Sequence, residues 1–220
     1  MNMNNWNEDW IDITYPIFEN CTGWPDQPAV SFDEISHVHC GEGAKVSILH
    51  LSAHTGTHMD GPNHFVENAP DIASFPLSVG MGPVRVADLD SEREITPDDL
   101  EKYEFRTRPI KAGERLFMRT KNSNEFWLDK PFNYGYLAIG NAAADWLAER
   151  KVALVGVDYL SVGPYETTPA THRSLINGDV WIVEGLDLRE IEEGDYETIC
   201  MPLKIKDCDG SPARVLLKKR

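Results

Sequence analysis

Hydrophobic and polar residues alternate in several short segments of the chain, a pattern typical of strands. Residues 10–14, Trp-Ile-Asp-Ile-Thr, repeat with the period of two that sends successive side chains to opposite faces, and Pro16 ends the repeat. Residues 152–157 are instead continuously apolar, which predicts a strand buried on both faces. Further strands are predicted at residues 44–53, 83–88, 115–119 and 180–183.

The last part of the chain predicts an antiparallel hairpin. Residues 198–205 and 213–217 carry the two strand patterns. Between them stands Asp209-Gly210, a dipeptide that favours tight hairpin turns because both residues tolerate a left-handed backbone. We therefore expect the chain to turn at Asp209-Gly210.

Two helices are predicted by their composition and their first residues. Thr96 is a suitable N-cap, since Pro97 follows at the first helical position and two aspartates complete the first turn. Residues 141–150 contain three consecutive alanines and further helix formers. Because the strand at 152–157 follows almost immediately, this helix and that strand should be adjacent in space.

These elements predict a single α/β domain over residues 1–220, with a mixed β-sheet and outer helices. The chain of 220 residues is long enough for one large core, and its 41% hydrophobic and 26% charged residues are ordinary globular values. Its first residues lack the basic and apolar parts of a signal peptide. We expect residues 1–8 to be a flexible tail on a cytoplasmic protein.

The charge of the chain restricts its partners. A net charge of −15 and a pI near 4.8 argue against nucleic acid, whose phosphates would be repelled. No apolar run is long enough to span a bilayer, so no membrane partner is expected. The four cysteines form no CxxC pair and are expected to be free thiols: Cys21, Cys40, Cys200 and Cys208.

Two irregular segments are rich in aromatic residues and leave alternatives open. Residues 19–28 form a turn-rich stretch around Trp24, which is either a surface loop anchored by one indole or part of a substrate pocket. Residues 121–134 form a long loop with Phe126, Trp127 and Phe132. This loop is either a binding loop or lid, or a segment packed by its own aromatics.

The most informative stretch is residues 54–64, His-Thr-Gly-Thr-His-Met-Asp-Gly-Pro-Asn-His, which holds three of the 7 histidines. His54, His58 and Asp60 are donors of the kind that Zn²⁺ or Mn²⁺ prefers. Scattered histidines are usually surface or core residues, but core packing does not call for this combination. The residues that exclude a regular helix here and favour a tight loop are Gly56, Gly61 and Pro62.

This stretch matches, at each specified position, the H-x-G-T-H-x-D-x-P-x-H signature of the metal-dependent hydrolases called the cyclase family. That family includes bacterial kynurenine formamidase and isatin hydrolase. The resemblance extends over nearly the whole chain and implies a swivelling β/β/α fold. It is carried by residues 12–17, 156–158 with Ser161, His172, residues 184–186, 202–205 and 209–214.

The resemblance implies a set of metal ligands for one or two divalent ions. His54, His58 and Asp60 would hold one ion. Asp60, His172 and Glu184 would form a second position, with Asp60 shared between the two. From the sequence alone, a single glutamate such as Glu184 is more often solvated than a ligand.

The resemblance also assigns proton transfer to His64, and the side chain of Trp24 is expected to bind substrate. An amine leaving group needs a general acid, and the near-neutral pKa of histidine suits that task. The alternative is that His64 is itself a ligand or supports one.

These residues imply that the protein hydrolyses an amide, which would be either an aryl formamide or a cyclic amide. The attacking water would be activated by a bound dication. Alternatives are an isatin or lactone hydrolase, a metal-dependent isomerase or dehydratase, and a non-catalytic metal-binding protein. The chain departs from the formamidase pattern after Pro25, where Asp26-Gln27 replaces Gly-Asp, and at Gly185, where asparagine is usual.

A homodimer or higher homo-oligomer is also expected. The aromatic loop at 121–134, together with Trp6 and Trp10, offers more large apolar side chains than the surface of a monomer usually carries. The family resemblance points the same way.

Overall fold

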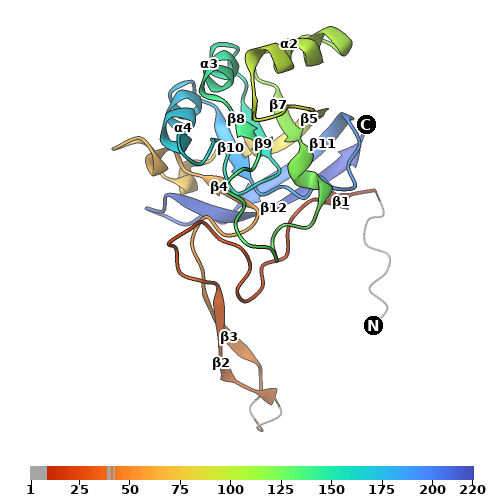
Figure 1. The fold of residues 1–220 in the computed structure, drawn as a ribbon. Helices are drawn as coiled ribbons and strands as arrows, with labels where there is room; N and C mark the ends of the chain where they lie inside the picture. Colours follow the sequence, from red (N-terminus) through yellow and green to blue (C-terminus); the bar gives the residue numbers. More distant parts are fainter. Residues whose placement is uncertain (1–8, 39–40, 42) are drawn as a thin grey trace.

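The computed structural model describes residues 9–38, 41 and 43–220, so the expected tail at residues 1–8, with Trp6, lies outside the described residues. Figure 1 shows a body of strands with helices gathered on one side and a two-stranded arm on the other. The strands are β1 (Ile11–Asp12), β2 (Ser31–Ser36), β3 (Val46–His50), β4 (His58–Asp60), β5 (Met81–Asp88), β6 (Glu94–Ile95), β7 (Arg115–Arg119), β8 (Ala138–Ile139), β9 (Leu154–Val157), β10 (Trp181–Glu184), β11 (Gly194–Pro202) and β12 (Gly210–Lys219). The α-helices are α1 (Leu77–Gly80), α2 (Pro97–Arg106), α3 (Asn141–Glu149) and α4 (Thr168–Asn177), and the short 3-10 helices are η2 (Pro62–His64), η3 (Ile72–Ser74) and η4 (Lys121–Asn124).

The main sheet closes into a barrel. Its strands follow the order β12-β11-β5-β7-β9-β10-β4, and β4 pairs again with β12. The pairs from β5 through β7 and β9 to β10 are parallel and the others are antiparallel, which confirms a mixed sheet in an α/β domain. The sequence did not predict the closure, because β4 is only three residues long and reads as part of a loop.

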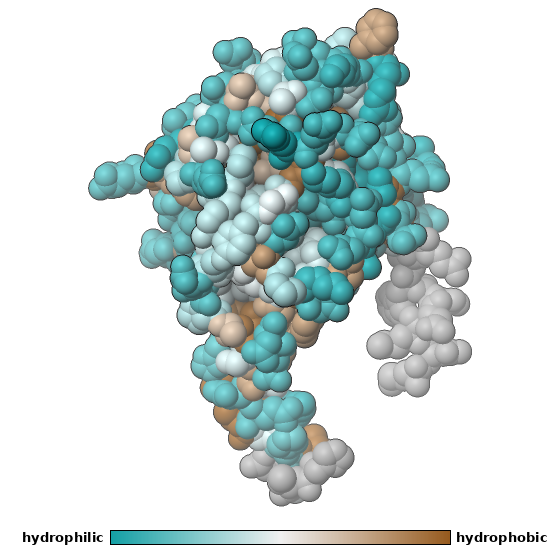
Figure 2. Space-filling view, viewed as in Figure 1, coloured by the Kyte–Doolittle hydropathy of each residue, from teal (hydrophilic) through white to brown (hydrophobic). Residues whose placement is uncertain are grey.

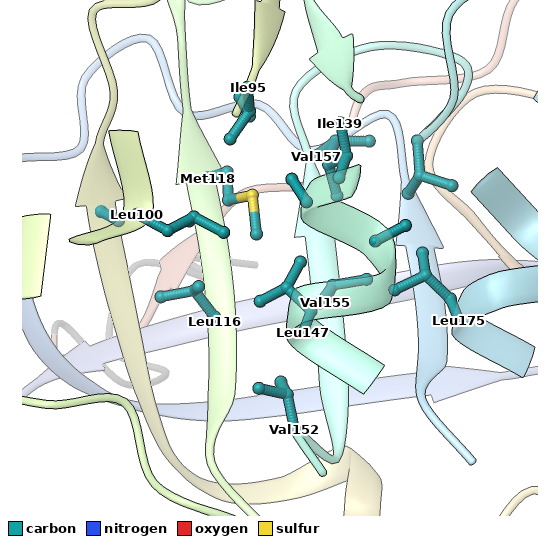
Figure 3. Close-up of a cluster of buried hydrophobic side chains, with 14 of the residues drawn as sticks. Ile95, Leu100, Leu116, Met118, Ile139, Leu147, Val152, Val155, Val157 and Leu175 are labelled. Atoms are coloured by element: carbon teal, nitrogen blue, oxygen red, sulfur yellow. The ribbon is translucent and has the colours of Figure 1, made fainter. Parts of the chain in front are cut away.

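Two apolar clusters lie on the two sides of this barrel wall. Leu116 and Met118 of β7 face the helices, whereas Phe117 between them faces the barrel interior. All four residues of β9 are buried, as its continuous apolar run predicted. Figure 3 shows the cluster on the helical side, where Leu147 of α3 and Leu175 of α4 meet the strands.

The expected neighbours α3 and β9 do pack together. The amide of Val152 donates to the carbonyl of Leu147 at 3.3 Å, and Leu147 shares one cluster with Val155. The predicted start of α2 is also confirmed, because Thr96 and Asp99 form a reciprocal capping box.

The C-terminal hairpin differs from the prediction in the position of its turn. The chain turns at Lys206 and Asp207, and Asp207 has a left-handed φ of 62°. Gly210 is already the first residue of β12, where it pairs with Asp60 of β4. Pairing with a third strand therefore draws the Asp209-Gly210 dipeptide out of the turn and into the barrel.

The aromatic loop at 121–134 packs mainly against rings from other segments, such as Tyr15, Trp24 and Tyr159. Trp127 and Leu128 are buried in a third cluster with Tyr15, and the Trp127 indole donates to the carbonyl of Asp158 at 2.9 Å. The largest ring of the loop is therefore not available to a partner, which weakens one argument for a dimer.

Strands β2 and β3 form an arm that pairs with no other strand among the described residues. Every residue of β3 is exposed, and apolar side chains such as Ile35, Ile48 and Leu49 are 44–61% exposed. Figure 2 shows hydrophobic surface, in brown, along the arm below a mostly hydrophilic body. No helix in the described part of the chain is both long and apolar enough to cross a membrane.

Candidate active site

The five expected metal ligands converge at one end of the barrel. His58 and Asp60 lie on β4, and Glu184 at the end of β10 is the direct cross-strand partner of His58. His172 reaches the same point from α4, and His54 from the turn before β4. Four of these side chains are almost fully buried, with residue exposures of 1–3% for His58, Asp60, His172 and Glu184.

Each histidine directs one ring nitrogen at the two carboxylates. His54 Nδ1 lies 3.0 Å from Asp60 Oδ1, and His58 Nε2 lies 3.1 Å from Glu184 Oε2. His172 Nε2 lies 3.2 Å from Asp60 Oδ2 and 3.1 Å from Glu184 Oε1. The ligand-capable atoms of His58, Asp60 and Glu184 all lie within 4.8 Å of one another.

The opposite ring nitrogens are held from outside the cluster. His58 Nδ1 is 2.9 Å from the carbonyl of Gly56, and His172 Nδ1 is 2.8 Å from that of Thr168. A carbonyl only accepts, so each Nδ1 carries the proton, and in a neutral ring Nε2 then presents a lone pair. Such a lone pair faces carboxylate oxygens, an arrangement that a cation between them would stabilise.

Two buried atoms of the cluster have no hydrogen-bond partner, namely His58 Nε2 and Asp60 Oδ2. His58 Nε2 is close to Glu184, but the direction of the contact does not suit a hydrogen bond. Unsatisfied buried polar atoms are costly and call for an explanation such as a bound ion. Nitrogen and carboxylate oxygen donors in this number suit Zn²⁺ or Mn²⁺, so the residues fit the expected metal.

The electrostatics of the cluster are consistent with a cation site. Burial by itself raises the pKa of Asp60, but the neighbouring imidazoles of His172 and His54 outweigh it and hold that pKa well below its usual range. Burial also opposes the charged form of His54 and His172. Their carboxylate partners outweigh it and raise the pKa of each imidazole to about 10. The site thus attracts positive charge, and protons occupy it when no metal does.

His64 closes the cluster from η2, beside His54. The two rings stack with centroids 4.0 Å apart, and burial lowers the pKa of His64 below its ordinary value. Its side chain is 27% exposed and lines the cavity described below. Ligand-capable atoms of His54, Asp60 and His64 also lie within 4.8 Å of one another, so the geometry permits both expected roles of His64.

A cavity of about 520 Å³ opens beside the histidines. Trp24 lines it as expected, together with Gln27 from the same turn-rich segment. Phe65 and Tyr165 add aromatic surface, and Tyr165 lies 5.3 Å from Trp24 between ring centroids. The sequence analysis did not identify Phe65 or Tyr165. Phe65 directly follows the signature, which was the available signal, whereas Tyr165 had none.

The ligand loop is fixed to the end of β10. Thr57 Oγ1 accepts from the amide of Tyr15 at 2.9 Å and donates to the carbonyl of Gly185. Gly56 and Gly185 both have a left-handed backbone, with φ of 60° and 67°. Glycine suits this backbone, and the departure at position 185 also removes a Cβ that would lie 2.4 Å from the carbonyl oxygen of Gly56.

Comparison with known proteins agrees with this site. Residues 11–164 match the sequence profile of the family described as "Putative cyclase". This chain belongs to the Cyclase family. It is 33% identical over 214 residues to the kynurenine formamidase of Bacillus thuringiensis subsp. konkukian, covering 96% of this chain and 97% of the relative.

Two solved structures share the fold. "The Structure Of Potential Metal-Dependent Hydrolase With Cyclase Activity" is 32% identical with a TM-score of 0.83, and covers 96% of this chain and 98% of that chain. Isatin hydrolase A from Labrenzia aggregata is 24% identical with a TM-score of 0.78, over 96% and 93% of the two chains, and this likeness shows the fold alone. The predicted family is confirmed, and the protein is related to metal-dependent hydrolases.

Proposed function

We propose that this Cyclase-family protein is an arylformamidase-like hydrolase that cleaves the amide of a small aromatic or cyclic substrate with one or two bound Zn²⁺ or Mn²⁺ ions. The observation that carries the proposal is the buried cluster of three imidazoles around two carboxylates, in which His58 Nε2 and Asp60 Oδ2 lack hydrogen-bond partners. The kinship with a kynurenine formamidase supports this choice of reaction.

The ligands would be His54, His58, Asp60, His172 and Glu184, as the family resemblance implies. A divalent ion held there supplies a Lewis acid that activates water and polarises a carbonyl. The surrounding contacts, from Gly56 and Thr168 among others, hold the imidazoles in the orientation this requires.

His64 would move the proton. Its lowered pKa leaves the ring neutral near pH 7, so it can accept a proton as the nucleophile forms and return it to the leaving amine. Its ring stacks on that of the proposed ligand His54, and both line the cavity, so His64 can reach a leaving nitrogen of a substrate bound there.

The cavity supports an aromatic substrate. Trp24, Phe65 and Tyr165 offer flat apolar surface on which an aryl ring can pack, and about 520 Å³ is large enough for a one- or two-ring compound. Trp24 would contact the ring of the substrate directly.

The test is a substrate panel on metal-loaded protein: an aryl formamide, an isatin and an aryl lactone, each run with and without a chelator. Chelator-sensitive turnover of the aryl formamide supports the proposal. Turnover of isatin alone would refute the arylformamidase assignment and leave hydrolysis of a cyclic amide, and turnover of the lactone alone, or of none of the three, refutes the proposal. In H₂¹⁸O, hydrolysis must place the label in the released carboxylate, whereas an isomerase or dehydratase would not.

The protein would act as a homodimer through its arm. A two-stranded hairpin is at best marginally stable alone, and this one exposes apolar side chains without a layer of its own to cover them. A second copy can cover both arms reciprocally around one twofold axis, which makes it the simplest partner.

A further inference from the structure

The carboxylate of Asp209 lies between two histidines of the site. Asp209 Oδ2 is 3.1 Å from His54 Nε2 and 3.4 Å from His64 Nδ1. The sequence placed this residue in a turn, but its backbone is fixed at the edge of the barrel. The carbonyl of Asp209 accepts from the amide of Gly61 at 2.8 Å, directly after the ligand strand β4.

The next residue, Gly210, makes room for the His54 ring. A Cβ at this position would lie 2.7 Å from His54 Cε1 and 3.0 Å from the carbonyl of Met59. No ordinary side chain fits there, so the imidazole rests directly against the backbone of β12. Asp209 and Gly210 together therefore fix both the place and the direction of His54.

His54 differs from the other two histidines in the group that supports it. His58 and His172 are supported by backbone carbonyls, whereas His54 is supported by a carboxylate. A carboxylate bonded to the outer ring nitrogen fixes the tautomer and makes the inner nitrogen a stronger donor. His54 Nδ1, which faces Asp60, is that inner nitrogen.

We propose that Asp209 is a positioning residue that holds His54 with Nδ1 directed at the metal and, through the same oxygen, orients His64 for proton transfer. This rests on the proposed function only in taking His54 as a metal ligand. One carboxylate thereby links the ligand to the acid/base residue. The side chain of Asp209 is 49% exposed, so removing it should affect the site more than the fold.

The test measures the affinity of metal-free protein for Zn²⁺ alone and Mn²⁺ alone. Asp209→Asn keeps the shape of the side chain and removes its charge. The matched control is Asp207→Asn, two residues earlier in the same connection, where Asn tolerates the φ of 62° equally well. We expect Asp209→Asn to weaken metal binding roughly 10-fold, and Asp209→Ala up to about 100-fold, with Asp207→Asn unchanged.

A second readout separates orientation from general damage. The ¹⁵N shifts of the imidazole rings in zinc-loaded protein report which nitrogen carries the proton, and in the native protein His64 should be protonated on Nδ1. Asp209→Asn should give a mixture of His64 tautomers, whereas Asp207→Asn should keep the native tautomer.

The outcomes distinguish this inference from the proposed function. Native metal affinity and native tautomers in both Asp209 variants would overturn the role of Asp209. Unchanged metal affinity in His54→Ala would instead overturn the ligand assignment on which it rests.

Discussion

Position 185 requires glycine for two reasons, a left-handed backbone and a lack of space for a Cβ. Comparison with a second glycine can separate the two. The φ of Gly185 is +67°, and a Cβ there would lie 2.4 Å from the carbonyl oxygen of Gly56. Gly56 stands between the proposed ligands His54 and His58, and Gly185 directly follows Glu184. A side chain at 185 would therefore push apart the two segments that carry the proposed metal ligands.

The expected loss of folding free energy in Gly185→Ala is the sum of a backbone cost and a steric cost. The left-handed backbone costs an alanine about 1–2 kcal/mol. The forced contact with backbone adds about 1–3 kcal/mol, the usual cost of overpacking. Gly113→Ala is the matched control, because Gly113 has a φ of +77° but no atom within 4 Å of the added Cβ. Gly185→Ala should thus lose about 1–3 kcal/mol more than Gly113→Ala.

Urea and thermal denaturation of the metal-free proteins measure this difference. At roughly 2–4 °C per kcal/mol for a chain of this size, Gly185→Ala should melt about 2–12 °C below Gly113→Ala. It should also bind Zn²⁺ more weakly, whereas Gly113→Ala should bind it normally. Equal losses of stability in the two variants, or native zinc affinity in Gly185→Ala, would refute the reasoning.

Two further predictions concern the protons of the site and the arm. His54 and His172 have pKa values raised from 6.5 to about 10, so in the metal-free protein they contribute stability below pH 6.5 that is lost as the pH rises towards 10. Metal binding at pH 7.5 should therefore release protons and tighten with rising pH, and calorimetry in two buffers of different ionisation enthalpy that detects no release would contradict this. In the arm, Leu49→Asp should convert a dimer of twice 24.8 kDa into a monomer in sedimentation, whereas Leu77→Asp, on the body and equally exposed at 62% against 61%, should not. A native protein that sediments only as a monomer would refute the dimer itself.

Much of the barrel was predictable because its strands carry local patterns. The apolar run at 152–157 and the shorter one at 116–118 each describe a strand whose faces meet two different apolar clusters. The closure was not predictable, since it depends on pairing between β4 and β12, about 150 residues apart, and β4 is only three residues long. The same pairing explains why Asp209-Gly210 does not form the turn that its composition favours.

The site was predictable to the extent that it is local in sequence. His54, His58, Asp60 and His64 lie within one short loop, and their clustering alone indicates metal binding. His172 and Glu184 are brought there by α4 and β10, so only the family resemblance could assign them. Asp209 enters the site through the register of β12, which no local pattern encodes.

The central claim is that the buried cluster holds the metal while His64 moves the proton, and one paired measurement tests it. Metal content and turnover are determined together for His58→Ala and His64→Ala, on whichever substrate of the panel is hydrolysed. His58→Ala should lose the metal, because the site then has one donor fewer. His64→Ala should keep its metal and lose about 10²–10⁴-fold in turnover, the usual contribution of general acid–base catalysis. Equal metal loss in both variants would make His64 a ligand, and full activity in His64→Ala would remove it from the mechanism.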